Sequence, residues 1–157
     1  MPSTSSASEF VDACYHEAAH AVVAHALGLT VIKLEVDELG AGCTWVKHVR
    51  RGVYDPFKFC VVAAAGCNHS SSQVLVPHRS TGDGKSIVTM GEEGGTVKIG
   101  GLSIAIVCRV ASRLVLEYRK DIRVVAKELS KVHKLSGRSF AKLVTVKKGQ
   151  ADVDFGV

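Results

Sequence analysis

Residues 13–28 read ACYHEAAHAVVAHALG, and this stretch decides the fold of the chain. Alanine is the strongest helix former, and glycine is the residue that most often follows the end of a helix. Upstream, Ser6 and Glu9 have the spacing of a capping box, which favours a helix start near Ala7. We therefore predict one alanine-rich helix that starts near Ala7 and stops at Gly28.

Two histidines and one glutamate on this helix form the pattern HExxH. His16 and His20 are four residues apart, so they share one helix face and both imidazoles can reach one ion. This pattern gives Zn²⁺ two neutral ligands and an open coordination position, with Glu17 beside them to act as a base on water. The alternative is a histidine-rich helix whose rings face solvent. His25 follows on the opposite face of the helix, so we do not expect it to be a ligand.

The composition is that of one globular domain. With 157 residues, 46% hydrophobic and 22% charged, the chain can bury a core without disulfides. We expect a flexible N-terminus over residues 1–8, a single domain over 9–146 and a flexible tail over 147–157. The net charge of +5 is spread over several segments and aromatic residues make up only 6%, which disfavours nucleic-acid binding.

Cysteine usage and the apolar segments indicate a cytoplasmic protein. Five cysteines without a CxxC pair are typical of buried, reduced thiols. Residues 1–8 lack the features of a signal peptide. The most apolar stretch, residues 99–116, contains Arg109 and Arg113, which favours a core helix over a membrane span.

The rest of the chain predicts a mainly α fold with a small β-ribbon. Residues 31–37 alternate apolar and polar side chains, as a half-buried strand does, and a glycine turn separates them from a second predicted strand over residues 43–49. Further helices are predicted over residues 57–67, 102–118, 121–133 and 136–144.

The histidine helix resembles that of the FtsH-type ATP-dependent zinc proteases. Residues 16–25, HEAAHAVVAH, are similar to the family's HEAGHAxVA helix, with Ala19 in place of the usual glycine. The strand from residue 31, the segment Gly42-Cys43-Thr44 and the C-terminal helices are also similar to the family's pattern, so the resemblance covers most of residues 10–145. It implies an FtsH peptidase-domain-like helical array that hydrolyses peptide bonds.

In that family the third metal ligand is an aspartate after a T-G-x-x-x-D-like segment. Matching Thr81-Gly82 literally puts Ser86 at this position, whereas matching the start of the helix puts Asp83 there. We prefer Asp83 because it is the only carboxylate in the segment, and a carboxylate suits zinc where a serine hydroxyl does not. A helix cap at Asp83 without metal stays open, and His69 or His78 are the next candidates for the ligand.

The resemblance thus implies Zn²⁺ bound by His16, His20 and Asp83, with Glu17 as the catalytic base. We expect the domain to act without an ATPase module of its own, on peptides or already unfolded proteins, and the sequence is compatible with a homo-oligomer. The alternative is a catalytically silent metal-binding or protein-interaction domain of the same fold.

Overall fold

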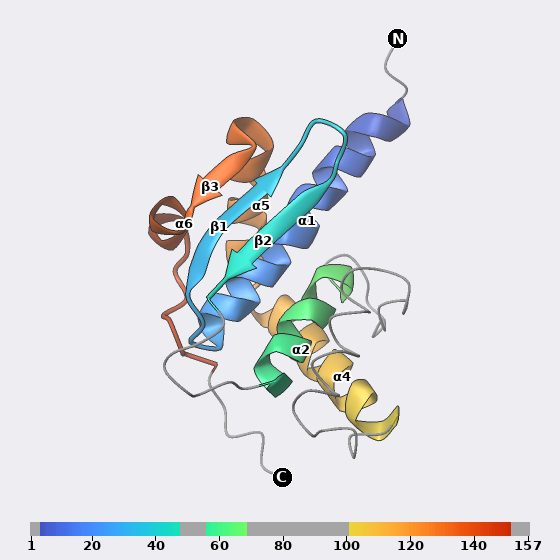
Figure 1. Ribbon diagram of the computed structural model, residues 1–157, viewed down its shortest axis with the longest axis vertical. Helices are drawn as coiled ribbons and strands as arrows, with labels where there is room; N and C mark the ends of the chain where they lie inside the picture. The colour runs from blue at the N-terminus through green and yellow to red at the C-terminus, as the bar shows by residue number, and fades with distance from the viewer. Residues whose placement is uncertain (1–3, 48–55, 69–100, 152–157) are drawn as a thin grey trace.

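The computed structural model describes residues 4–47, 56–68 and 101–151 (Figure 1). The fold is mainly helical with a small antiparallel sheet, which confirms the predicted fold class. In chain order the elements are α1 (Thr4–Ala26), β1 (Val31–Val36), β2 (Gly42–Val46), α2 (Pro56–Ala65), the 3₁₀-helix η1 (Gly66–Asn68), α4 (Gly101–Glu117), α5 (Arg119–Val132), β3 (Lys134–Ser136) and α6 (Gly137–Leu143).

Helix α1 ends as its sequence predicts. Gly28 has a φ of +84°, a conformation in which a side chain would be strained. Its N–H donates to the carbonyl of His25, and the N–H of Leu29 donates to the carbonyl of Ala24. These two bonds form a Schellman motif, which satisfies the last carbonyls of the helix. The helix begins at Thr4, slightly before the predicted start and within the segment expected to be flexible.

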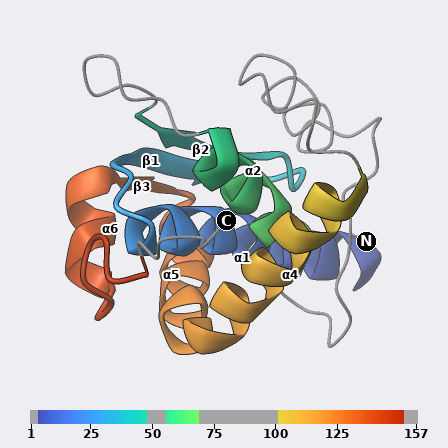
Figure 2. The same ribbon diagram turned by 90° about the horizontal axis from the view of Figure 1, so that it is seen from below.

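The core surrounds α1. The sheet lies along one side of the helix, α5 packs on the other side, and α2 and α4 pack together beside its middle (Figures 1 and 2). The alanines in the second half of α1 are fully buried and let these neighbours approach closely; they are Ala18, Ala19, Ala21, Ala24 and Ala26. Larger side chains fill the remaining space, and each buried valine or leucine stabilises the fold by about 1.5–3 kcal/mol. The largest include Val22, Leu27, Leu34, Leu129 and Phe140.

The sheet has the strand order β2-β1-β3, and both pairings are antiparallel. Leu34 of β1 lies opposite Thr44 of β2 and opposite Leu135 of β3, so β1 is the central strand. The predicted ribbon is therefore confirmed, although β2 ends at Val46 and residues 48–49 lie outside the described part. Strand β3 was not predicted, because three residues are too few to show an alternation of apolar and polar side chains.

The predicted helices are present with small shifts of their ends. The helix expected over residues 57–67 ends at Ala65 and tightens into η1. At the start of α6, the Ser136 hydroxyl accepts a hydrogen bond from the backbone N–H of Ser139, as an N-cap does. Among the helices of the described residues, none combines the length and the apolar character that a membrane crossing requires.

Residues 147–151, assigned to a flexible tail by the sequence, are tied to the end of α1. The N–H of Gly149 donates to the carbonyl of His25, and the N–H of Ala151 donates to that of Ala26. Ala151 is buried. These bonds satisfy carbonyls that the end of α1 leaves without a helical partner.

The cysteines differ in exposure. All five lie in the described residues, and none forms a disulfide. Cys14, Cys60 and Cys108 are buried as predicted, whereas Cys67 is half-buried and Cys43 is exposed on β2. The prediction of burial was wrong for Cys43, because in the described residues β2 lies at the end of the sheet and the side chain of Cys43 is exposed on it.

Candidate metal centre

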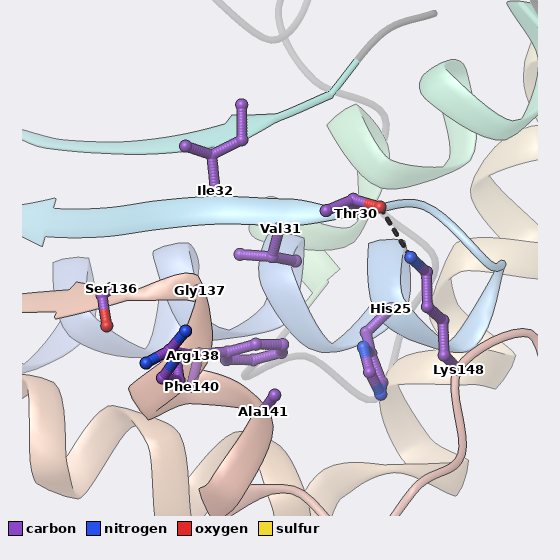
Figure 3. Close-up of a pocket in the computed structure, with 10 residues that line it drawn as sticks. All are labelled: His25, Thr30, Val31, Ile32, Ser136, Gly137, Arg138, Phe140, Ala141 and Lys148. Carbon is purple, nitrogen blue, oxygen red and sulfur yellow. Dashed lines mark hydrogen bonds between the residues drawn. The ribbon is translucent and has the colours of Figure 1, made fainter. Parts of the chain in front are cut away.

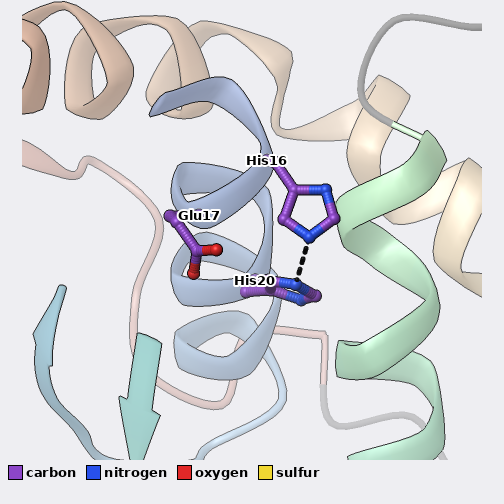
Figure 4. A group of neighbouring side chains, drawn as sticks. All are labelled: His16, Glu17 and His20. Atoms are coloured by element: carbon purple, nitrogen blue, oxygen red, sulfur yellow. Dashed lines mark hydrogen bonds between the residues drawn. The ribbon is translucent and has the colours of Figure 1, made fainter. Parts of the chain in front are cut away.

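His16, Glu17 and His20 lie together on α1, between β2 and α2 (Figure 4). One ligand atom from each lies within 4.8 Å of the others. The Nε2 atoms of His16 and His20 are 3.0 Å apart, and the two rings meet edge to face. Two imidazole nitrogens that bind one tetrahedral zinc lie about 3.3 Å apart. The histidine pair thus has nearly the separation that a shared zinc ion requires.

A hydrogen bond from α2 sets the tautomer of His20. Its Nδ1 lies 2.6 Å from the carbonyl oxygen of Val62. A carbonyl only accepts, so Nδ1 carries the proton and the neutral ring keeps a lone pair on Nε2. With Nε2 of His20 as the acceptor, Nε2 of His16 donates in the hydrogen bond between the two rings, and it must give up this proton to bind an ion. Metal-binding histidines are commonly oriented in this way by a backbone carbonyl on the other nitrogen.

The carboxylate of Glu17 is buried and held by β2. The Thr44 hydroxyl lies 2.6 Å from Oε2 of Glu17 and 3.1 Å from the backbone oxygen of Glu17. A Cβ at Gly42 would lie 2.6 Å from Cγ and 2.9 Å from Oε1 of Glu17, so only glycine allows the strand to pass this close. Thr44 and Gly42 therefore belong to the site, although the sequence analysis gave them no role there. The segment Gly42-Cys43-Thr44 in the family resemblance was the signal that could have indicated them.

Gly66 of η1 forms the opposite wall of the site. A Cβ on this residue would lie 2.6 Å from Cε1 of His16 and 2.6 Å from Nε2 of His20. A side chain at this position would displace both rings. Because Gly66 has none, η1 can lie directly beside the two Nε2 atoms. The sequence does not indicate Gly66, because the contact joins residues that are far apart in the chain.

Cys14, one turn before the glutamate, is not a ligand in this arrangement. Burial raises the pKa of its thiol to about 11, and the nearby Glu17 carboxylate adds to this shift. Within the described part of the chain, the only group of side chains with metal-binding geometry consists of His16, Glu17 and His20.

His25 lies away from this group, as its helical position predicts. Its Nε2 is 3.2 Å from the carbonyl oxygen of Val146, and its ring packs edge-on against Phe140. Burial lowers the pKa of His25, so the ring is mostly neutral near pH 7.

The predicted third ligand, Asp83, lies outside the described residues, as do its rivals His69, His78 and Ser86. Comparisons with protein-family models, with curated proteins and with solved structures find no match for this chain.

Proposed function

We propose that the protein is a zinc-dependent metallopeptidase in which His16, His20 and Asp83 bind the ion and Glu17 is the general base. The observation that carries the proposal is the convergence of two histidine Nε2 atoms, 3.0 Å apart, beside a buried carboxylate on the same helix. This donor set suits zinc, which prefers imidazole and carboxylate ligands in a tetrahedral arrangement.

Zinc, when bound, supplies Lewis-acid polarisation of the scissile carbonyl and lowers the pKa of a coordinated water towards neutrality. The residues of the chain supply the proton transfer. Thr44 donates to Oε2 of Glu17, which orients the carboxylate and leaves Oε1 as the oxygen that can act on water. From there Glu17 can accept a proton from water and return it to the leaving amine.

The edge strand β2 favours an extended substrate. In the described part of the chain β2 lies at the end of the sheet, and a strand in this position is the kind to which a peptide backbone can add. Residues 42 and 44 of this strand contact Glu17, so a peptide on this edge would pass beside the base. We therefore propose peptides or unfolded proteins as substrates, because their chains can adopt the extended conformation that strand addition requires.

A second candidate function is a silent interaction domain. The hydrogen bond between His16 and His20, and the one between His20 and Val62, give protein partners to both ring nitrogens of His20. A histidine pair satisfied in this way can be structural and need no ion.

Cleavage of a reduced, alkylated and therefore unfolded protein separates the two functions. We expect Glu17→Gln to keep zinc, because a general base does not need to bind the ion, and to lower cleavage at least about 100-fold. Glu38→Gln is the matched control, since Glu38 is exposed beyond β1. Equal cleavage by the parent and Glu17→Gln would rule out the proposed mechanism.

The third ligand is tested by zinc affinity. Loss of one of three protein ligands should weaken zinc binding by orders of magnitude, whereas loss of a helix cap costs about 0.5–2 kcal/mol of stability and leaves zinc binding unchanged. We expect only Asp83→Ala, among the variants Asp83→Ala, His69→Ala, His78→Ala and Ser86→Ala, to lose the metal. If Asp83→Ala binds zinc as the parent does, Asp83 is not the ligand.

We also propose a cytoplasmic location. The support is that none of the five cysteines is in a disulfide, as is usual in a reducing compartment. Fractionation of cells that produce the protein tests this location.

A further inference from the structure

A pocket of about 460 Å³ lies beside His25 (Figure 3), whose position in the helix places it on the opposite face of α1 from the histidine pair. It opens between the start of β1, helix α6 and the segment that carries Lys148. Pockets that hold small molecules typically measure about 300–1,000 Å³, so its volume is in the range of ligand sites. None of the metal-centre residues lines it.

The inner wall of this pocket is apolar and fixed in place. Val31 and Phe140 are buried, and Ala141 lies beside them. The ring of His25 packs edge-on against Phe140 and is held by its hydrogen bond to the carbonyl of Val146. Since these side chains are already packed, a ligand would meet a preformed surface, which reduces the entropy lost on binding.

The mouth of the pocket is positively charged. Arg138 and Lys148 are exposed and line it, and no aspartate or glutamate is among its lining residues. The Nζ of Lys148 donates a hydrogen bond to the Thr30 hydroxyl, 2.6 Å away, which keeps the ammonium group at the mouth. In the described residues, none of the ion pairs includes Arg138. Its guanidinium is thus available to an anion.

We propose that this pocket binds a small organic anion, with its apolar body against Phe140 and its carboxylate or phosphate head at Arg138 and Lys148. A guanidinium presents paired N–H donors that match the oxygens of either head group. The apolar wall adds affinity for a hydrocarbon body, at about 0.8 kcal/mol per buried methylene. A cation of the same shape would be repelled. This inference is independent of the proposed peptidase function.

Hexanoate, hexyl phosphate and hexylammonium test the proposal, by calorimetry and by shifts of backbone NMR signals in the full chain. We expect saturable binding of at least one of the two anions, with the largest shifts at Thr30, Val31 and Ala141. The anion that binds more tightly identifies the head group. Hexylammonium should show no saturable binding. Acetate should bind at least about tenfold more weakly than hexanoate, because it lacks the apolar body.

Variants locate the site. Arg138→Gln and Lys148→Gln should each weaken anion binding about tenfold, a loss typical of a charge-assisted hydrogen bond. Lys142→Gln is the matched control, because Lys142 is exposed on α6 and does not line the pocket. Ala141→Leu should weaken the binding of the hexyl anions by filling the space for their body.

Three results would overturn the proposal. The first is no saturable binding of either anion. The second is equal binding of hexylammonium. The third is unchanged affinity in both Arg138→Gln and Lys148→Gln. Glu17→Gln should bind the anion as the parent does, so failure of the peptidase function would leave this test intact.

Discussion

The Thr44 hydroxyl donates a 2.6 Å hydrogen bond to Oε2 of Glu17, and this bond joins the edge strand β2 to the helix that carries both histidines. A carboxylate that acts as a base must be held at a fixed angle to the water that it deprotonates. In this protein the strand proposed to bind substrate also orients the base.

Thr44→Val removes this hydrogen bond and keeps the shape of the side chain. We expect the kcat for peptide hydrolysis to fall about 10- to 100-fold, because a misdirected base transfers protons poorly. Zinc content should not change, since the hydrogen bond that is lost is made to Glu17 and not to a proposed histidine ligand. Thr44→Ser keeps the hydroxyl and should retain most activity. A loss of zinc in Thr44→Val, or equal losses of activity in both variants, would contradict this role.

Gly66 and Gly42 form a matched pair of tests. In Gly66→Ala the new Cβ meets the rings of His16 and His20, so we expect zinc affinity to fall about tenfold or more. In Gly42→Ala the Cβ meets Glu17 instead, so zinc binding should remain while hydrolysis is lost. Each variant should also lose about 1–3 kcal/mol of stability from overpacking.

Zinc titration and cleavage assays on both variants separate these effects. The opposite pattern, with zinc lost in Gly42→Ala and kept in Gly66→Ala, would mean that the two walls of the site are wrongly assigned.

Asp121 holds the segment after α6 against α5. Its buried carboxylate accepts hydrogen bonds from the backbone N–H of Thr145, the Thr145 hydroxyl and the backbone N–H of Val146. Asp121→Ala leaves these donors without their acceptor and should cost about 2–4 kcal/mol of unfolding free energy, as measured by urea denaturation. Asp37→Ala, which removes an exposed turn carboxylate, should cost less than about 1 kcal/mol. Equal losses would show that burial of Asp121 adds nothing.

The free energy of unfolding should decrease in acid because His25 becomes protonated. Burial lowers the pKa of this residue in the folded state, so the unfolded chain binds the proton more readily. The unfolding free energy should therefore decrease as the pH falls through about 6.5, the usual histidine value, towards the lower folded-state pKa. His25→Gln should remove this part of the pH dependence, as measured by urea denaturation at several pH values. If His25→Gln shows the same dependence of unfolding free energy on pH as the parent, His25 is not the cause of the loss of stability in acid.

Much of the fold was predictable, because its strongest signals are local. The HExxH spacing, the alanine content and Gly28 define α1 within a few residues, and the alternation after Gly28 identifies β1. Strand β3 was missed because it is three residues long and forms only by pairing with β1. The position of residues 147–151 likewise depends on contacts with a distant part of the chain, namely hydrogen bonds to the end of α1, and their own composition does not indicate it.

The residues of the candidate site that lie close together in the sequence were predictable. The contacts that come from elements distant in the sequence were not. His16, Glu17 and His20 follow from helical periodicity alone, and the structure brings them together. Thr44 reaches them from β2, and only the family resemblance points to the segment that carries it. Gly66 reaches them from η1, and no spacing in the sequence indicates which glycine will do so.

Zinc stoichiometry in two histidine variants is the sharpest test of the proposed metal centre. We expect about one tightly bound zinc per chain after dialysis of the parent. His20→Ala should lose it, whereas His25→Ala, altered on the opposite face of the same helix, should keep it. The melting temperature of each variant, measured with and without added zinc, shows whether the fold survives the change. Full zinc retention in a folded His20→Ala protein, or no zinc binding by the parent, would contradict the account.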